Sequence, residues 1–367
     1  MSCNKEIANA MGHDCYVDYI VESISQGHVL AETHPPFLTL RKSNGRTFHD
    51  FKKICGDGTW ADGTPIKVGV GDTGIDATHL SRGEFGNAVN KNFTSDRTAT
   101  DINGHGSHVS GHIMARANDA QIQGIASKAQ LFSAKVLGGR QGSGLTTWIQ
   151  NGVEWMAESG CKIINLSLGG GGFDRSSEAL YKRLDEAGII VNAATGNDGK
   201  GGERGGYPAR YNYVNSIAAV DYNLRTASFS SESRSITKAG YGVGIDSLWI
   251  NGRRASISGT SMATPDQTGL DLNFLGYFDR LGKGKLNRTE LDKLLQVGIV
   301  DLGIDGRDTY YGAGFVDIWK VIDHYGMPEE GAPPVKPVDP VEPPVCEEPD
   351  VLFRFPIAGK TYAIVEL

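Results

Sequence analysis

The chain has 367 residues, of which 39% are hydrophobic and 22% charged, as in an ordinary globular protein with one large domain or two smaller ones. The formal net charge of −7 argues against a nucleic-acid partner, and no apolar run is long enough to span a bilayer, which argues against a membrane partner. The N-terminus lacks the basic region and apolar core of a secretory signal, and the five cysteines follow no CxxC spacing, so we expect a cytoplasmic protein with mostly reduced thiols.

Residues 1–57 predict an irregular N-terminal extension, a candidate propeptide. Within it, residues 34–40 (HPPFLTL) are expected to be extended, because each proline pushes the residue before it out of the helical region. The extension therefore reads as an appendage to a core that begins near residue 58.

The core begins with a β-branched run over residues 66–72 that ends in a glycine turn, so Asp72 is expected at the carboxyl end of a strand. Gly69, Gly71 and Gly74 also satisfy GxGxxG, which indicates a dinucleotide site only where a helix opens directly after the turn. Residues 75–83 have no amphipathic helical period. A nucleotide-dependent oxidoreductase is therefore the weaker interpretation of this stretch.

Three histidines follow at helical spacing, at positions 105, 108 and 112. A metalloprotease helix would need a glutamate next to the first histidine, and none is present. The alternative is one catalytic histidine, His105, at the start of a helix, with His108 and His112 in structural roles. We favour this second interpretation and expect no metal site here.

Between residues 130 and 220, apolar runs of strand length alternate with helical patterns. The strands are expected at residues 130–137, 162–168, 189–195 and 216–220, and the helices at 146–159 and 176–187. This alternation predicts an α/β fold, a three-layer αβα arrangement around a mostly parallel sheet. Sites in such folds lie beyond the carboxyl ends of the strands, where Asp72 and the turns at 168–170 and 196–198 fall.

The segment 258–265 (SGTSMATP) reads as a glycine turn that opens a helix. Gly259 can take backbone angles forbidden to other residues, and Pro265 suits the first helical turn. A serine held here, Ser261, would project its hydroxyl from a rigid turn and its N–H from the positive end of the helix dipole. A nucleophile and half of an oxyanion hole need these two features, although a plain capped helix start would look similar.

Helices are expected to continue over residues 264–281 and 289–295. Residues 327–349 are proline-rich and acidic, which is typical of a stiff solvated linker. Residues 350–367 contain two alternating runs around Ala358-Gly359-Lys360 and predict a short C-terminal hairpin, too small to be stable alone.

The motifs VGVGDTGID, NGHGSHVSGH, AATGNDG and SGTSMATP stand in the order aspartate, histidine, asparagine, serine, and together they resemble the subtilisin-like serine proteases. The resemblance covers roughly residues 60–320 and makes residues 58–326 a peptidase domain. It implies an Asp72–His105–Ser261 triad, with the Asn197 side chain and the Ser261 N–H holding the oxyanion. The implied activity is that of a serine endopeptidase acting on polypeptides through an acyl-enzyme intermediate.

The resemblance also implies where the substrate binds. Two edges are expected to pair with an extended peptide, and these are Gly142-Ser143-Gly144 and Ser167-Leu168-Gly169. Ala194, Gly196 and Gly206 would form the wall and floor of a roomy, largely apolar pocket for the side chain before the scissile bond, with Asp198 near its rim. Thr146, Ile149 and Leu168 would shape a more distant apolar pocket, or they are plain core residues.

The sequence departs from the family after Pro265, where Asp266 and Gln267 stand in place of histidine and valine, and the same helix carries Asp271. The charge of Asp266 is expected to act on the pKa of the catalytic histidine. The loop 116–122 resembles a calcium loop of the family, with Asn118 as a side-chain ligand, but Ser81 stands where an aspartate ligand would be expected. We expect no cofactor for catalysis, and a structural calcium ion is allowed rather than predicted.

The extension is shorter than the folded propeptides of secreted relatives, so the chain looks most like the intracellular subtilisins. We expect residues 34–40 to lie across the cleft and restrain activity, since prolines make a poor substrate strand. The competing interpretation from another class is a catalytically silent, subtilase-shaped binding module. The natural substrate and the oligomeric state do not follow from the sequence.

Overall fold

The computed structural model describes residues 43, 45–117 and 122–328, together with the backbones of strands at 20–23, 351–357 and 360–365. The chain divides into two compact units, residues 1–332 and 333–367, and each is described by itself. In the described part of the second unit, β15 (Val351–Ile357) and β16 (Lys360–Val365) pair antiparallel, which is the arrangement expected of the C-terminal runs. Most of the expected linker 327–349, and the extended segment 34–40, lie outside the described residues.

The first unit is built on a central sheet of nine described strands in the order β13-β14-β10-β9-β8-β6-β2-β4-β3. All neighbouring pairs are parallel except β13 with β14. The strands are β2 (Lys67–Asp72), β3 (Val89–Asn92), β4 (Gln130–Lys135), β6 (Ile163–Leu166), β8 (Ile190–Ala194), β9 (Asn215–Val220), β10 (Ile236–Tyr241), β13 (Ile299–Val300) and β14 (Phe315–Val316).

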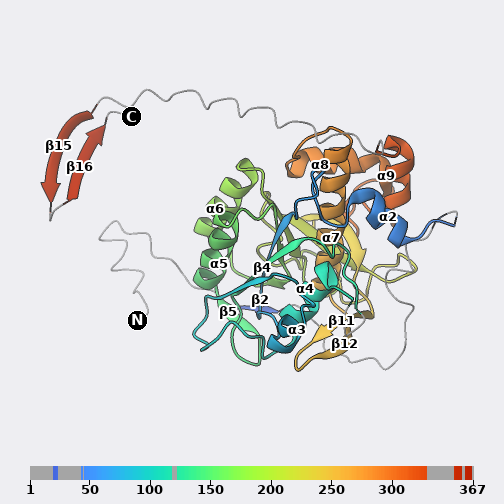
Figure 1. The fold of residues 1–367 in the computed structure, drawn as a ribbon, viewed down its shortest axis with the longest axis horizontal. Helices are drawn as coiled ribbons and strands as arrows, with labels where there is room; N and C mark the ends of the chain where they lie inside the picture. Colours follow the sequence, from blue (N-terminus) through green and yellow to red (C-terminus); the bar gives the residue numbers. More distant parts are fainter. Residues whose placement is uncertain are drawn as a thin grey trace. The chain divides into compact units, whose positions relative to one another are not determined.

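Helices cover both faces of this sheet (Figure 1). On one face lie α5 (Thr146–Glu158) and α6 (Arg175–Glu186), and on the other lie α4 (His105–Met114) and the long α7 (Thr260–Arg280). Each face has its own apolar core, because the strands are buried on both sides as parallel strands usually are. The predicted three-layer αβα class and mostly parallel sheet are therefore confirmed.

The predicted strands and helices in this region begin and end within a few residues of the observed ones. The prediction omitted β10 and the antiparallel hairpin of β11 (Ile245–Trp249) and β12 (Arg253–Ile257). The hairpin turn holds Asn251 and Gly252 at φ 61° and 66°, an Asn-Gly signal that was present in the sequence. Smaller helices complete the unit, namely α3 (Ala77–Ser81), α8 (Arg288–Leu295) and α9 (Ile318–Tyr325).

One expectation about the N-terminal extension is wrong. The end of the extension, expected to be irregular, contains α2 (Phe48–Cys55), which a Thr47–Asp50 capping box opens. Phe48, Phe51 and Cys55 are fully buried, and the Phe51 ring lies 5.3 Å from that of Phe274 in α7. Residues 48–55 therefore belong to the core of the first unit.

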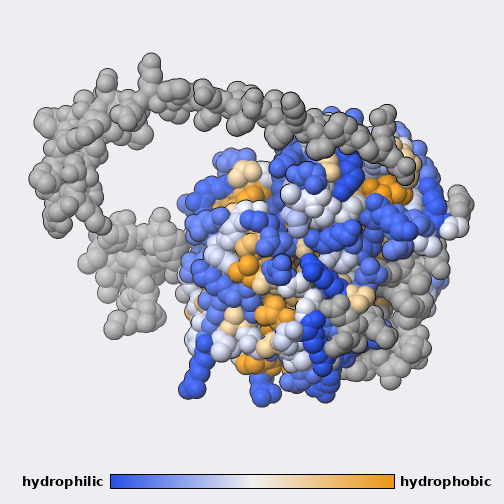
Figure 2. All heavy atoms as spheres, in the orientation of Figure 1, coloured by the Kyte–Doolittle hydropathy of each residue, from blue (hydrophilic) through white to orange (hydrophobic). Residues whose placement is uncertain are grey.

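The visible face of the molecule is mostly hydrophilic, with hydrophobic residues in small separate groups (Figure 2). Among the described residues, none of the helices combines the length and the apolar character that a membrane crossing requires.

Candidate active site

The carboxyl end of β2 places Asp72 against the first residue of α4, His105. Both side chains are only 1% exposed. The two carboxylate oxygens of Asp72 lie 2.8 and 2.9 Å from Nδ1 of His105, so the carboxylate accepts a hydrogen bond from this nitrogen when it carries the proton. This leaves Nε2 as the proton acceptor of a neutral His105, the state that a general base needs.

The loop before His105 fixes the direction of α4. Gly104 has φ 116°, a conformation that strongly favours glycine, and a Cβ there would collide with the Trp249 ring. The buried Asp101 carboxylate accepts hydrogen bonds from the backbone N–H groups of Asn103, Gly104 and Ser107. Burial raises the pKa of Asp101, and these hydrogen bonds act in the opposite direction. The histidine is therefore presented by a rigid, internally bonded turn.

Ser261 is the second residue of α7 and is fully buried. The preceding Gly259 has φ 164°, extended backbone that any residue can adopt, so the expected glycine-only turn conformation at this residue is wrong. Pro265 is also not in the first turn but is the sixth residue of the helix. Ser261 nevertheless lies in the first turn, where backbone N–H groups have no helical acceptor.

Pro265 and Ser167 together anchor the segment that carries Ser261. Pro265 has no N–H, so the Ser261 carbonyl four residues earlier loses its helical partner. The Ser167 hydroxyl donates to that carbonyl at 2.8 Å, and the Ser261 hydroxyl donates to the Ser167 carbonyl at 3.0 Å. The reciprocal pair ties α7 to the segment between β6 and β7 (Leu168–Gly169), so the proline inside the helix has a positional explanation.

Asn197 follows β8 in a turn whose Gly196 has φ 127°. Its side-chain oxygen accepts hydrogen bonds of 3.0 Å from both the backbone N–H and the hydroxyl of Thr260, the residue before Ser261. These bonds fix the amide orientation, and the buried Nδ2 finds no hydrogen-bond partner among the described residues. The same holds for Nε2 of His105. Buried polar groups are rarely left without a partner, so these two atoms indicate where a ligand would bind.

The two expected peptide-binding edges lie on either side of a described strand. β5 (Ser143–Leu145) and β7 both pair antiparallel with β1 (Ile20–Ser23), which forms the middle of a three-stranded sheet. The paired residues are Ile20–Leu145, Val21–Gly144, Glu22–Ser143, Glu22–Gly169 and Ser23–Leu168. Apart from Gly142, which precedes β5, and Ser167, which precedes β7, every expected edge residue is thus in strand contact with β1.

The residues expected to surround the first specificity pocket come together at the end of β8. Ala194 ends that strand, and the Gly206 N–H donates to the Thr195 carbonyl at 2.9 Å. A Cβ on Gly206 would lie 3.2 Å from the carbonyl oxygen of Gly170, so a side chain here would crowd the gap next to β7. The structure therefore brings Ala194, Gly196 and Gly206 close to the β7 edge.

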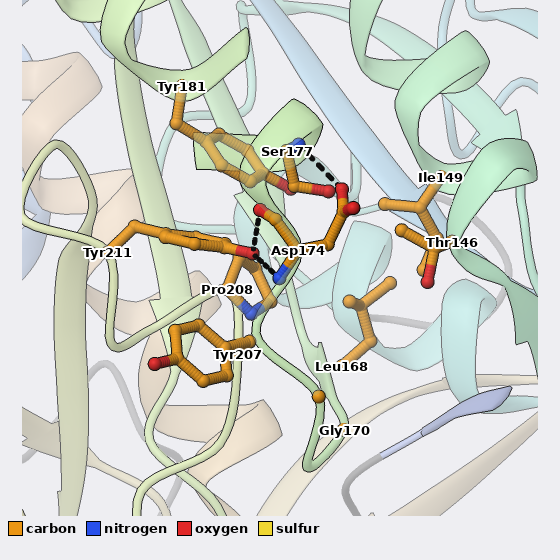
Figure 3. A pocket seen from close by; sticks show the side chains of 11 residues that line it. Thr146, Ile149, Leu168, Gly170, Asp174, Ser177, Tyr181, Tyr207, Pro208 and Tyr211 are labelled. Atoms are coloured by element: carbon orange, nitrogen blue, oxygen red, sulfur yellow. Dashed lines mark hydrogen bonds between the residues drawn. The ribbon is translucent and has the colours of Figure 1, made fainter. Parts of the chain in front are cut away.

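A small pocket of about 30 Å³ lies beside β7, lined by Thr146, Ile149 and Leu168 as expected (Figure 3). Its opposite wall was missed by the sequence analysis and consists of Tyr181, Tyr207 and Tyr211. The Tyr211 hydroxyl donates to the Asp174 carbonyl at 2.8 Å and accepts from the Asp174 N–H at 3.0 Å. Tyr181 lies in α6, and the other two tyrosines lie in the segment after Gly206. No local sequence pattern predicts that they line one pocket.

Two further histidines of α4 and the cysteines of the described residues lie outside this arrangement. Nε2 of His108 lies 2.9 Å from the Ile245 carbonyl and 3.1 Å from that of Ala255, which joins α4 to the β11–β12 hairpin, and burial lowers the pKa of His108 to about 3. His112 is buried in α4. Cys55 and Cys161 are buried free thiols whose burial raises their pKa, to about 12 for Cys161, so neither suits a nucleophile.

The described residues lack one kind of metal site, a cluster of acidic, histidine and cysteine side chains. No group of three or more His, Cys, Asp or Glu side chains that could hold a metal occurs in residues 43, 45–117 and 122–328. Ser81 donates its hydroxyl to the Thr78 carbonyl of its own helix, and Asn118, with residues 119–121 of the calcium-like loop, lies outside the described residues. Hard cations need several oxygen ligands, so we derive no step through calcium.

The acidic departures in α7 face the sheet. The Asp266 carboxylate accepts a hydrogen bond of 2.9 Å from the Tyr241 N–H at the end of β10. Asp271 accepts from the side chains of Asn192 and Gln267 at 2.9 and 2.7 Å. The carboxylates of both residues therefore accept hydrogen bonds inside the protein, between α7 and the sheet.

Comparison with known proteins points to one family. The model of the subtilase family matches residues 63–314. Subtilisin DY of Bacillus licheniformis is 36% identical over 262 residues, which are 70% of this chain and 90% of that protein. The major intracellular serine protease of Bacillus subtilis is 35% identical over 270 residues, covering 70% and 83%. The thermostable alkaline protease of Halalkalibacterium halodurans is 40% identical over 208 residues, covering 57% and 56%.

Proposed function

Because the chain belongs to the subtilase family and is a serine-type endopeptidase, we propose that it cleaves peptide bonds with a triad of Ser261, His105 and Asp72. The observation that carries this proposal is the pair of buried atoms without a partner, Nε2 of His105 and Nδ2 of Asn197, on segments that adjoin the start of α7. One is a proton acceptor and the other a hydrogen-bond donor. Acyl transfer needs both beside its nucleophile.

In the proposed reaction, the Ser261 hydroxyl attacks the scissile carbonyl while Nε2 of His105 takes its proton. The hydroxyl leaves its resting bond to the Ser167 carbonyl, a small rotation for a side chain in the first turn of a helix. Asp72 holds the imidazole orientation and stabilises the imidazolium. His105 then returns the proton to the leaving amine, and water hydrolyses the acyl-enzyme by the same sequence of transfers.

The tetrahedral intermediate would be held by Nδ2 of Asn197 and the backbone N–H of Ser261. Asn197 is preorganised, because Thr260 occupies its oxygen and thereby fixes which side of the amide is free. Asn197→Ala is expected to lower kcat by about 10²–10³-fold with little change in KM, since the donor acts on the charge that develops in the transition state.

Substrate would bind as an extended strand between β5 and β7 in the place that β1 occupies, where its backbone would pair with both edges. Ala194, Gly196 and Gly206 would surround the side chain before the scissile bond, and their small size supports a broad or apolar preference. The pocket of Thr146, Ile149 and the three tyrosines would take a side chain farther toward the N-terminus of the substrate.

The position of β1 supports restraint of this cleft by the N-terminal extension. The strand that pairs with both edges is Ile20–Ser23, whereas the expected segment 34–40 lies outside the described residues. Deleting residues 1–42 removes β1 and keeps α2, and should raise kcat/KM on a small peptide substrate. Equal activity of the full chain and the deletion variant, both folded by circular dichroism, would contradict this restraint.

A fluorophosphonate tests the proposed nucleophile directly, because it labels only an activated serine. We expect labelling of the deletion variant and none of its Ser261→Ala form. Ser228→Ala is a matched control, because Ser228 is exposed and is not a member of the proposed triad. A folded deletion variant that stays unlabelled would favour the silent binding module instead. The relative named as an intracellular protease supports our further proposal that this chain acts in the cytoplasm.

A further inference from the structure

A second hollow, outside the peptide cleft, gathers positive charge. It has a volume of about 330 Å³ and lies among the start of β10, the turn after Tyr211 and helix α8. Five cationic side chains line it against a single carboxylate, that of Asp292. We call it the basic hollow, and its cations are Arg210, Arg234, Lys238, Arg288 and Arg307. Such a concentration is unexpected in a chain of net charge −7.

Two of these cations are neutralised within the protein. Arg288 binds Asp185 with two contacts of 2.7 and 3.2 Å, and the buried Lys238 ammonium lies 2.6 Å from Asp292. These pairs account for the only carboxylate of the lining. The positive potential of the hollow therefore comes from the other three arginines.

Those three guanidinium groups retain free donors. Arg234 is exposed, and its side chain forms no ion pair or hydrogen bond with any described residue. Arg307 donates to the Ile236 carbonyl, which uses one of its five N–H groups. Arg210 forms an ion pair of 3.7 Å with Glu203, too long for a hydrogen bond, so its N–H groups stay available, and its guanidinium lies over the Tyr207 ring. Like charges gathered around one hollow repel, and an anion between them would relieve that repulsion.

The rest of the lining suits an oxyanion on a compact ligand. The Asn212 side chain offers a neutral donor, whereas the Thr237 and Ser235 hydroxyls already donate to Ser216, and Tyr211, Val214 and Leu295 form a buried, largely apolar floor. Arginine forks match phosphate oxygens in two-bond geometry, and the volume lies in the range of small-molecule sites. Tyr211 also lines the pocket beside β7, so the hollow lies behind a wall of the peptide-binding region without sharing its entrance.

From these observations we propose that the basic hollow binds a compact phosphate-bearing anion through Arg210, Arg234 and Arg307. This site is separate from the proposed triad. Its occupancy needs no proteolytic activity, so it can be measured in a Ser261→Ala protein that cannot digest itself.

The test is isothermal titration of full-length Ser261→Ala protein with inorganic tripolyphosphate at low salt. We expect one saturable site that weakens as salt rises, because screening acts on the arginine contacts. Adding Arg234→Ala should weaken binding about tenfold, the usual effect of one charge-assisted contact. Arg225→Ala is the matched control, since Arg225 is exposed, free of ion pairs in the described structure and outside the hollow.

Three results would overturn the proposal. One is the absence of saturable binding at millimolar tripolyphosphate, and another is an equal loss for Arg225→Ala and Arg234→Ala, which would indicate non-specific attraction. The third is tighter binding of a hexaglutamate peptide than of tripolyphosphate, which would assign the hollow to an acidic polypeptide. Arg307→Ala provides a second variant. After its folding is checked by circular dichroism, its affinity for tripolyphosphate is compared with that of the Arg225→Ala control.

Discussion

The two faces of the central sheet are covered by helices in different ways. On the side of α5 and α6, the interface is apolar and includes the fully buried Val153 and Met156 of α5. On the side of α7, the strands present buried polar residues to the helix that carries Ser261. The same parallel strands therefore pack against an apolar interface on one face, and against an apolar core crossed by a hydrogen-bonded network on the other.

The polar network can be followed from the nucleophile segment into the core. Asn165 of β6 donates to the Ser167 hydroxyl at 3.0 Å and accepts from Thr268 of α7 at 2.9 Å. Asn192 of β8 then donates to Thr268 at 3.1 Å and to Asp271 at 2.9 Å. These bonds connect the Ser261 carbonyl to the neighbouring strands β6 and β8.

The network ends at a buried ion pair. Lys238 of β10 lies 4.0 Å from Asp271 and 2.6 Å from Asp292 of α8. Apolar contacts hold two surfaces together but tolerate small sliding movements, whereas hydrogen bonds are directional. We infer that the polar face fixes the position of α7, and that the apolar face supplies mainly stability.

The largest expected effect comes from removing a buried carboxylate on the polar face. Asp271→Ala takes the acceptor from the Asn192 and Gln267 side chains and leaves the buried Lys238 with Asp292 alone, so it should lower the free energy of unfolding by about 3–5 kcal/mol. Denaturant unfolding of the Ser261→Ala protein measures this loss. A loss below about 1 kcal/mol would refute the structural role assigned to Asp271.

On the apolar face, Met156→Ala should lower the free energy of unfolding by about 2–4 kcal/mol through the cavity it leaves. Because no polar contact to the nucleophile helix is lost, kcat on a peptide substrate should stay within about twofold of the unchanged protein at a temperature where both are folded. A large drop in kcat without loss of stability would contradict the inference that the apolar face contributes mainly to stability.

Acidification should lower the stability of the protein through the buried His108 of α4. Burial holds the pKa of His108 at about 3, so between pH 6.5 and that value only the unfolded chain takes up its proton. The contribution of His108 to stability therefore falls on acidification by about 1.4 kcal/mol per pH unit, or about 2 kcal/mol at pH 5. The free energy of unfolding, measured from pH 7 to pH 5, should fall less steeply for His108→Gln than for the unchanged protein. Identical slopes would contradict this role of His108.

The smallest expected effect tests the link between Pro265 and Ser167. Ser167→Ala leaves the Ser261 carbonyl without its donor and should lower kcat about tenfold with little change in KM. In a Pro265→Ala background, the restored N–H can donate to that carbonyl. The same Ser167→Ala change should then cost less, and an equal loss in both backgrounds would show that the two residues are independent.

Much of the fold could be predicted because its signals are local. Apolar periodicity located β6, β8, α5 and α6 within a few residues, and the alternation of strands and helices predicted the layers. α2 was missed although Thr47 and Asp50 form a capping box, because apolar residues of the helix are spread through a polar stretch. The special backbone conformation assigned to Gly259 was wrong, since a glycine in a motif need not use its conformational freedom.

The sequence by itself determined the order of the motifs, the identity of Asp72, His105, Asn197 and Ser261, and the αβα class, because these depend on residue type and spacing along the chain. Only the tertiary structure decided which groups meet. Asp72 and His105 are 33 residues apart, and Asn197 and Thr260 are 63 apart, yet each pair is hydrogen-bonded because the order of the parallel strands brings their carboxyl ends together. The tyrosine wall, the strand at 20–23 between two edges and the basic hollow have the same origin, since side chains from distant segments carry no mark of their future neighbours.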